Sequence, residues 1–211
     1  MKGFFKIIAV LTARLLVLPL YVPLAAAERF IRDDQPFQCC SQLLSLVPGI
    51  PGNYLRREFY RLSLAKCSSD CCIGFGTVLH QRTVEIGRRV YIGTNCSIGE
   101  CIIEDDALLG SNVDVISGNK QHFFDLPDVP VREQGGKLEK ITIGEDAWLG
   151  NSSVVMANIG RKSIVGAGSV VAGDVEPFSI VAGNPARFIK KRSGQAPANL
   201  SPISTAENAN R

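Results

Sequence analysis

The chain has 211 residues, a mass of 22.8 kDa and a formal net charge of +3. This length suits one well-buried domain with appendages better than two domains. The charge is mild and no long Lys/Arg run or interleaved aromatic-basic stripe occurs, so a nucleic-acid-binding protein is disfavoured. The seven cysteines form an odd set without a C-x2-C pair. That set indicates neither a zinc ribbon nor a complete disulfide framework, and it fits a reducing compartment.

Residues 1–27 form a hydrophobic segment that predicts membrane association. Its apolar run, IIAVLTARLLVLPLYVPLAAA at residues 7–27, has about the ~20 residues that cross a ~30 Å hydrocarbon core as a helix. A secretory signal peptide is the rival interpretation, because Lys2 and Lys6 resemble a basic n-region and three alanines end the run. Arg14 and two prolines inside the run favour a retained anchor, which would be a kinked, re-entrant or interfacial helix.

Residues 28–66 are predicted to form a juxtamembrane connector of two short helical stretches, broken at Pro48-Gly49 and Pro51-Gly52. The second stretch mixes apolar and aromatic side chains with four basic ones, Arg56, Arg57, Arg61 and Lys66. These basic side chains could face anionic lipid headgroups. They could equally form the solvated face of a helix that caps a core, and the sequence leaves both interpretations open.

Branched aliphatic residues recur every six positions in the following part of the chain. They form four series: Ile86, Ile92 and Ile98; Ile103, Leu109 and Val115; Ile143, Leu149 and Val155; and Ile159, Val165 and Val171. A glycine follows most of them, and a small residue recurs four places later, as at Cys96, Ala107, Ala147, Ser153, Ser163 and Ser169. Six is the period of neither a helix nor a simple strand. It predicts a solenoid whose unit is a short strand and a turn, with the aliphatic side chain inside.

This pattern resembles the hexapeptide-repeat acyltransferases, in particular their sugar O-acetyltransferase branch. The resemblance covers roughly residues 72–192 and implies a mainly β domain over residues 67–192. Its fold would be a left-handed parallel β-helix with three hexapeptides in each triangular coil. The terminal coils of such a solenoid need caps, which we expect from the preceding helix and from the segment after Val175. Residues 193–211 lack periodicity and aromatic side chains and are predicted to be disordered.

The longest break in the repeat is residues 117–140, SGNKQHFFDLPDVPVREQGGKLEK, which we expect to project as a loop. It contains His122, and the resemblance implies that a loop histidine at this place is catalytic. An imidazole, with an ordinary pKa of ~6.5, suits the removal of a proton from an acceptor that attacks a thioester. Asp125, Asp128 and Glu133 lie in the same loop, and the sequence does not choose which of them would orient the base.

The C-terminal stretches ITIGEDAWLGNSSVV, IVGAGSVVAGDV and VAGNPARFIKKR carry the most specific part of the resemblance. In the family, these coils and a neighbouring subunit of a homotrimer bind acetyl-CoA. Carried over by position, Gly166 and Ala167 would run along the pantetheine arm and Asn151 would contact the cofactor. Arg187 and Lys190 would lie near the CoA phosphates, for which a guanidinium and an ammonium group are natural partners.

The loop histidine and the CoA signature together predict transfer of an acyl group, expected to be acetyl, from CoA to a sugar hydroxyl. The hydrophobic segment favours a lipid-linked or surface-polysaccharide precursor as acceptor, with the catalytic domain in the cytoplasm. An N-acetyltransferase acting on an amino sugar or small molecule, and a non-catalytic β-helical scaffold at the membrane, stay open. A zinc enzyme on this fold would need three histidines. The chain has only His80 and His122, so no metal is expected.

Overall fold

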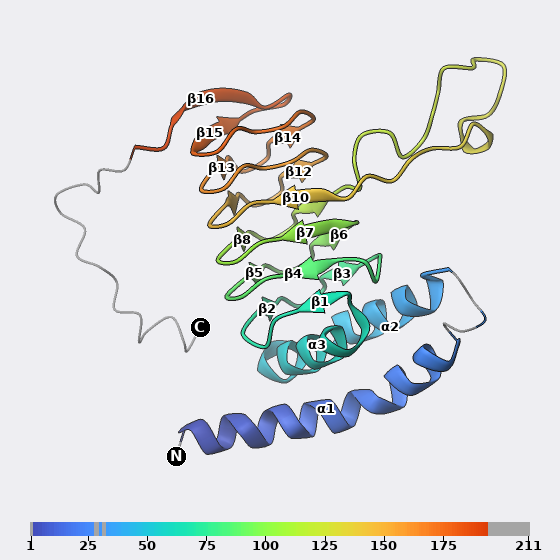
Figure 1. Ribbon diagram of the computed structural model, residues 1–211, viewed down its shortest axis with the longest axis vertical. Coiled ribbons are helices and arrows are strands. Elements are labelled where there is room, and N and C mark those ends of the chain that lie inside the picture. Colours follow the sequence, from blue (N-terminus) through green and yellow to red (C-terminus); the bar gives the residue numbers. More distant parts are fainter. Residues whose placement is uncertain (1, 28–29, 31–32, 194–211) are drawn as a thin grey trace.

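The computed structural model describes residues 2–27, 30 and 33–193. Short strands stack into a column of coils that stands on a layer of three helices (Figure 1). The predicted disorder of the tail concerns residues 194–211, which lie outside the described residues.

Three sheets form the sides of the column, and each of the first four coils contributes one strand to each sheet. All strand pairs are parallel except the pair of β15 and β16. Sheet A consists of β1 (Lys66–Cys67), β4 (Glu85–Ile86), β7 (Cys101–Ile103) and β10 (Ile141–Ile143). Sheet B consists of β2 (Cys72–Ile73), β5 (Tyr91–Ile92), β8 (Leu108–Leu109), β11 (Trp148–Leu149), β13 (Ile164–Val165), β15 (Ser179–Ala182) and β16 (Arg187–Lys191). Sheet C consists of β3 (Val78–Leu79), β6 (Ser97–Ile98), β9 (Asp114–Val115), β12 (Val154–Val155) and β14 (Val170–Val171). The predicted mainly β parallel solenoid is confirmed.

The six-residue period places its aliphatic side chains in the interior of the column. All twelve residues of the four predicted series are between 0% and 2% exposed. The recurring small residues, such as Cys96 and Ala107, are also buried. The coil is therefore held together by layers of branched side chains that pack on the coils above and below, which is the packing that the period predicts.

The turns allow the coils to approach one another closely. A Cβ atom added at Gly93 would lie 2.5 Å from the carbonyl oxygen of Gly110 in the next coil. A larger residue there would force two coils apart, so the position requires glycine. The turns also contain residues in the left-handed backbone region, among them Asn95 (φ 54°) and Asn112 (φ 56°), a residue type that tolerates it.

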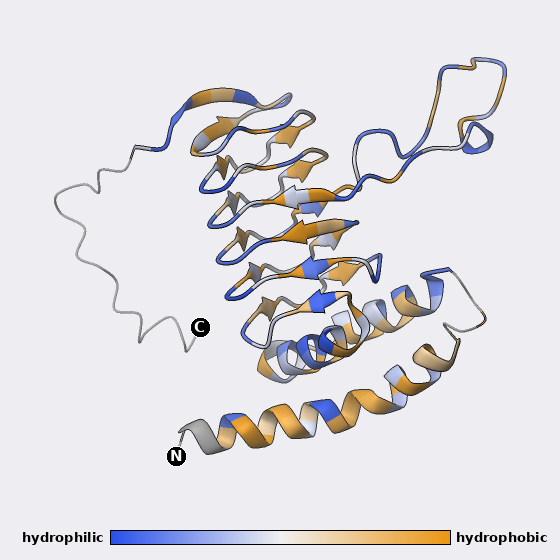
Figure 2. Ribbon diagram, viewed as in Figure 1, coloured by the Kyte–Doolittle hydropathy of each residue, from blue (hydrophilic) through white to orange (hydrophobic). Residues whose placement is uncertain are grey.

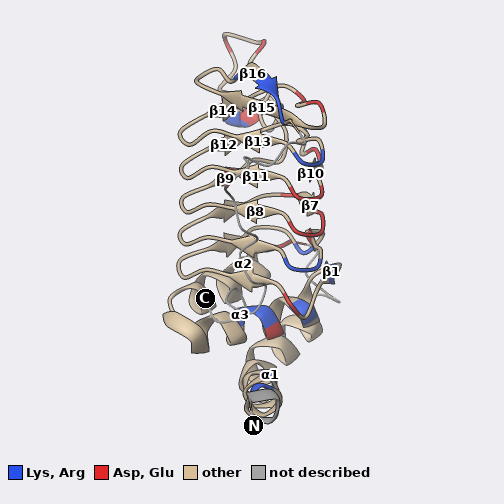
Figure 3. Ribbon diagram, turned by 90° about the vertical axis from the view of Figure 1, so that its left-hand side faces the viewer, with Lys and Arg blue, Asp and Glu red and all other residues tan. Residues whose placement is uncertain are grey.

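Charged side chains line the corner between sheets A and B (Figure 3). Acidic and basic residues alternate between coils there, except that Asp105 and Asp106 are followed on the next coil by Glu145 and Asp146. Arg88 bonds to Asp105 of the next coil at 2.7 Å, and Arg89 bonds to Asp106. These ion pairs are exposed, and each contributes little stability on its own. They do keep like charges apart along most of this corner.

The helical layer consists of α1 (Lys2–Ala27), α2 (Gln35–Ser45) and α3 (Gly49–Ser63). Phe37 of α2 packs against Phe59 and Tyr60 of α3 in a buried aromatic cluster. Only one of the two expected breaks separates the helices. Helix α3 begins at Gly49, directly after Pro48, and Pro51 and Gly52 lie in its first turn, where a proline costs no helical hydrogen bond.

Polar side chains of the helices form hydrogen bonds with backbone amides at the open edge of the first coil. The Ser41 hydroxyl accepts a hydrogen bond from the Leu79 amide (3.0 Å). The Asn53 side-chain oxygen accepts one from the Ile73 amide (3.1 Å). The helices thus cap the solenoid at its N-terminal end, since an unpaired sheet edge would invite association.

Two of the four basic residues predicted to face lipid or solvent are buried instead. Arg56 is 1% exposed and Arg57 is 6% exposed. Arg56 donates hydrogen bonds to the carbonyl oxygens of Ile73, Leu44 and Val47 at 2.9, 3.1 and 2.7 Å. The expectation was wrong for Arg56 because the carbonyls at the end of α2 and on the first coil require donors. It was wrong for Arg57 because this side chain is paired with the buried Glu58.

Glu58 of α3, which is 0% exposed, is the counter-ion of the remaining arginines in this layer. Its carboxylate bonds to Arg14 of α1 at 2.9 Å, to Arg61 at 3.0 Å and to Arg57 at 3.4 Å. The charge that interrupts the apolar run of α1 is therefore directed at α3. Within the described residues, the segment Phe5–Ala27 of α1 is the one helix long and apolar enough to cross a membrane.

Candidate functional site

The loop of residues 117–140 leaves the column between β9 and β10, at the corner where sheet C passes into sheet A (Figure 1). Its two arms run side by side near the column. The amides of Glu139, Lys137 and Phe123 donate to the carbonyl oxygens of Ser117, Lys120 and Gly135 at 2.9, 2.8 and 2.9 Å. The predicted projection is thus an extended ribbon with a defined base.

Two side-chain contacts fix the base of this loop to the corner. The buried Ser117 hydroxyl accepts a hydrogen bond from the Glu100 amide at 2.7 Å. The Asn119 side-chain amide donates to the carbonyl oxygen of Ala172, two coils further along, at 3.5 Å. The loop therefore leaves the column in a fixed direction.

His122 lies on the first arm of the loop, and its side chain is exposed. Gly136 passes close to it on the other arm, since a Cβ atom added at Gly136 would meet the His122 amide nitrogen at 3.0 Å. No hydrogen bond or ion pair to the His122 imidazole is formed within the part of the chain that the structure describes. Asp125, Asp128 and Glu133 are all exposed, and none of them is paired with the imidazole. The identity of the orienting carboxylate stays open.

Asn151, Gly166 and Ala167 come together at a different corner, where sheet B passes into sheet C. The Asn151 carbonyl oxygen accepts a hydrogen bond from the Gly168 amide of the next coil at 2.9 Å. Asn151 and Ala167 are exposed, and a Cβ atom added at Gly168 would meet nothing within 4 Å. This corner, the Asn151 track, is therefore an exposed stretch of backbone on two successive coils.

Arg187 and Lys190 lie on β16, which pairs antiparallel with β15 at the end of sheet B. Both side chains are exposed, and neither forms an ion pair among the described residues. The two basic residues that follow them, Lys191 and Arg192, are bonded within the protein. Lys191 donates to the Pro177 carbonyl oxygen at 3.1 Å and Arg192 pairs with Asp146 at 3.1 Å. The two basic residues predicted at the phosphates are thus the ones that remain available to a ligand.

The His122 loop and the Asn151 track lie at opposite edges of sheet C in a single chain. The loop leaves after strands of sheet C, whereas Asn151 and Ala167 precede strands of the same sheet. One chain therefore brings together the candidate donor-binding residues but does not bring them to His122. A site that uses both would need a second copy of the chain.

A polar column on sheet C was missed in the sequence. The His80 Nε2 atom is 2.9 Å from the Ser97 hydroxyl, and Asp114 is the register partner of Ser97 on the next strand. Burial lowers the pKa of His80, and the negative charge of Asp114 opposes this shift. Part of the signal was available, since Ser97 and Asp114 occupy equivalent places in successive repeats, whereas His80 lies two residues after the equivalent residue, Val78. The column is compatible with a structural role for His80 and with a place in an acceptor pocket.

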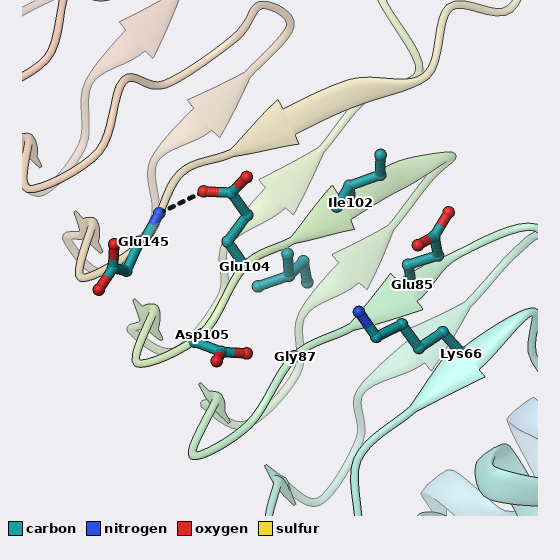
Figure 4. A pocket seen from close by; sticks show the side chains of 8 residues that line it. Lys66, Glu85, Gly87, Ile102, Glu104, Asp105 and Glu145 are labelled. Carbon is teal, nitrogen blue, oxygen red and sulfur yellow. Dashed lines mark hydrogen bonds between the residues drawn. The ribbon is translucent and has the colours of Figure 1, made fainter.

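A cavity of about 360 Å³ lies on the outer face of sheet A (Figure 4). Four acidic residues, Glu85, Glu104, Asp105 and Glu145, line it with Lys66. The Glu104 side chain accepts a hydrogen bond from the Glu145 amide at 2.8 Å. No predicted site residue lines this cavity, and its acidic walls would repel the phosphates of CoA. In the described ranges, no group of His, Cys, Asp and Glu side chains is arranged to hold a metal ion.

Comparison with known proteins gives a family-model match and a set of relatives. The model described as the hexapeptide repeat of succinyl-transferase matches residues 140–172. A chloramphenicol acetyltransferase of Agrobacterium fabrum (strain C58) is 33% identical over 119 residues, which cover 49% of this chain and 52% of that protein. The galactoside O-acetyltransferase of Escherichia coli (strain K12) is 32% identical over 115 residues, covering 51% and 54%. The chain spans about half the length of the curated relatives it matches.

A solved structure of a galactoside acetyltransferase in complex with coenzyme A superposes with a TM-score of 0.62 at 22% identity. The superposition covers 74% of this chain and 80% of that one. At this identity the likeness is one of fold. It supports the parallel solenoid independently of the repeat pattern.

Proposed function

Because the chain is a hexapeptide-repeat β-solenoid protein whose curated relatives are acetyltransferases, we propose that it transfers an acetyl group from acetyl-CoA to a hydroxyl of a sugar. One observation carries this proposal. The regular column is interrupted by a ribbon that holds an exposed, unpaired histidine, while the donor-type residues line a separate open corner. Long excursions from a regular scaffold commonly carry function.

In the proposed reaction His122 acts as the general base. The acceptor oxygen attacks the thioester carbonyl and forms the new C–O bond while the imidazole takes the hydroxyl proton. Collapse of the tetrahedral intermediate breaks the C–S bond, and the imidazolium returns the proton to the CoA thiolate. The products are the acetyl ester and free CoA, and no acyl-enzyme forms. The exposure of His122 supports this role, because the side chain is accessible to substrates.

The donor would lie along the corner that carries Asn151, Gly166 and Ala167, with its phosphates near Arg187 and Lys190. The open backbone track fits the pantetheine arm, and the two unpaired basic side chains fit a phosphate-bearing ligand. Since this corner and the His122 loop are at opposite edges of sheet C, the complete site would form between copies. A homotrimer, in which each loop reaches the donor corner of a neighbour, satisfies this requirement.

The acceptor class follows from the relatives and from the helical layer. The galactoside O-acetyltransferase supports a sugar hydroxyl, and the apolar helix α1 supports a lipid-linked or surface-polysaccharide precursor. The solenoid would then lie on the cytoplasmic side of the membrane, where acyl-CoA is made. The chloramphenicol acetyltransferase relative favours one competing acceptor, the hydroxyl of a small apolar molecule. Transfer to an amine and a non-catalytic scaffold are the remaining alternatives.

The first test is calorimetric binding of acetyl-CoA to the detergent-purified full chain. Arg187→Ala should weaken binding, because a phosphate would lose its guanidinium partner. Arg88→Ala removes the same charge at the corner between sheets A and B and should leave binding unchanged. Absence of binding to the wild-type chain would favour the scaffold. Equal weakening by both variants would show that net charge, rather than a phosphate site, is responsible.

The second test measures turnover by mass spectrometry of products from an acceptor panel: galactosides, an amino sugar, chloramphenicol and extracted glycolipids. His122→Ala should retain acetyl-CoA binding while turnover falls by the ~10²–10⁴ expected for a lost general base. Unchanged turnover in this variant would remove His122 from the mechanism. The product that is acetylated distinguishes O-transfer from N-transfer.

A further inference from the structure

Helix α1 is hydrophobic over most of its length, with a few hydrophilic residues between (Figure 2). On its outward face, the side of α1 that faces away from α2 and α3, large hydrophobic side chains are between 44% and 67% accessible, namely Phe5, Ile7, Ile8, Leu11, Leu15, Leu16 and Val22. Lys6 and Thr12 are exposed polar residues on the same helix. Seven large exposed hydrophobic side chains on one helix are more than the singly scattered ones that are normal on a soluble monomer. Such a surface implies a partner that covers it.

The opposite face of α1 is fixed against the protein. Ala13, Val17 and Leu24 follow one another at helical spacing, and each is at most 5% exposed. Val17 and Leu24 join the same hydrophobic core as the aromatic residues of α2 and α3. The bond from Arg14 to the buried Glu58 lies on this side as well. The rotation of α1 is therefore set, and the exposed apolar face is a permanent feature of the fold.

The orientation of α1 argues against a spanning helix. The helix crosses the base of the column, with α2 and α3 between it and the coils (Figures 1 and 3). Arg14 lies near the middle of the apolar segment, Phe5–Ala27. If α1 spanned a bilayer, its contact with Glu58 would draw the charged side chains of α3 to the hydrocarbon centre. Such placement is costly, whereas a helix lying flat keeps α3 on the aqueous side.

The charge distribution selects the kind of surface. Residues 1–66 contain nine Lys and Arg against four Asp and Glu, whereas residues 67–211 contain fourteen against sixteen. The excess positive charge is thus confined to the part of the chain that carries the apolar face. Anionic lipid headgroups attract such segments and contribute to binding within about a Debye length.

We propose that α1 lies in the plane of an anionic membrane, with its outward face inserted in one leaflet and the solenoid standing upright on that surface. This proposal rests on the proposed membrane association but not on acyl transfer. A failure of the membrane test would therefore leave the proposed acyl transfer untouched, and the reverse also holds. The partner that covers the apolar face in this proposal is a lipid bilayer. Apolar helices with one face in the hydrocarbon bind at this depth without spanning.

The depth of three positions tests the orientation. Ile8, Leu15 and Val22 are spaced by seven residues on the outward face, and each would be replaced by tryptophan singly in a Trp148→Phe background. Vesicles of phosphatidylethanolamine and phosphatidylglycerol (3:1), with brominated lipids of known depth, would report each position by quenching. A flat helix should give three similar depths. A spanning helix would place Leu15 about 10 Å deeper than the other two, because seven residues rise ~1.5 Å each.

Three outcomes would overturn the proposal. A deep Leu15 between two shallow positions would show a spanning helix. Equal affinity for phosphatidylcholine vesicles and for the anionic mixture would remove the role of the basic segment. No vesicle binding, with a dimer or larger assembly that dissociates when Leu15 is changed, would show that a second copy covers the face.

A charge placed on the outward face provides the matched comparison. Leu15→Glu should reduce sedimentation of the full chain with the anionic vesicles by at least tenfold, since a carboxylate would enter the leaflet. Leu108→Glu alters an exposed leucine of β8 on the column and should leave sedimentation unchanged. Circular dichroism of both variants confirms that the solenoid is folded. Equal binding by the two variants would contradict the insertion of this face.

Discussion

Replacement of Glu58 by glutamine tests the buried charge network that joins α1 to α3. The substitution keeps the shape of the side chain but removes the counter-charge of Arg14, Arg57 and Arg61. Removing one partner of a buried ion pair costs about 3–5 kcal/mol, because the other charge stays buried and unpaired. The Arg57 side chain is only 8% exposed, whereas those of Arg14 and Arg61 are 41% and 28% exposed and can recover some hydration. We therefore expect a loss near the lower end, about 3 kcal/mol.

The free energy of unfolding would be measured by urea denaturation in mild detergent, followed by circular dichroism. The matched control is Glu85→Gln, which removes the surface ion pair to Lys140 at 2.8 Å and should cost less than about 1 kcal/mol. Arg14→Met alone and combined with Glu58→Gln completes a double-mutant cycle that isolates the bond between α1 and α3. A loss below about 1 kcal/mol for Glu58→Gln would refute the assignment of Glu58 as the centre of this layer.

Two further predictions concern the core. Burial raises the pKa of Tyr60 to about 12 against an opposing hydrogen bond from Ser41. The stability that its neutral phenol contributes is therefore complete below pH 10 and lost as the pH rises from 10 to about 12. A titration of absorbance at 295 nm should show a phenol that ionises late and disappears in Tyr60→Phe, and its persistence in that variant would contradict the assignment. Gly93→Ala should destabilise the solenoid by about 1–3 kcal/mol through overpacking, while Gly173→Ala, where an added Cβ meets nothing within 4 Å, should be neutral in thermal melts.

The sequence predicts the column of the fold well because each repeat imposes the same local requirement. A branched side chain every six residues has to be buried in a narrow interior, and Ile92, Leu109 and Leu149 are each fully buried at equivalent positions. The glycine that follows each of them meets the backbone of the next coil. Periodic packing of this kind depends on near neighbours alone, so it can be predicted without knowledge of distant contacts.

The helical layer was predicted less completely because two of its arginines have distant partners: Arg14 bonds to Glu58, 44 residues away, and Arg56 bonds to the Ile73 carbonyl, 17 residues away. A cluster such as Arg56, Arg57 and Arg61 usually forms a solvated face, and nothing local distinguishes a buried arginine from an exposed one. Arg14 was the available signal. A lone charge within an apolar helix requires a counter-ion, and the nearest acidic residue flanked by arginines is Glu58.

The sequence predicted on which segments the candidate residues lie, but not that His122 and the donor-type residues are separated within one chain. The break in the repeat locates His122 on a projecting ribbon, and the C-terminal repeats locate Asn151 and Ala167 on an open corner. Their separation across sheet C follows from the triangular cross-section of the coil. The residue that orients His122 also stays unassigned, because an exposed loop acquires its contacts from substrates and neighbouring copies.

The number of coils between the helices and the loop sets the height of the loop above the helical layer. Three coils, β1–β3, β4–β6 and β7–β9, separate the helical layer from the base of the loop. With strands spaced ~4.8 Å apart, they raise the loop about 14 Å above the helices. On a chain that stands upright on a membrane, chemistry would occur at the height of an extended headgroup. The height of the loop would then select acceptors by length. Glycolipids with too few sugar units would not extend far enough from the membrane to reach the loop.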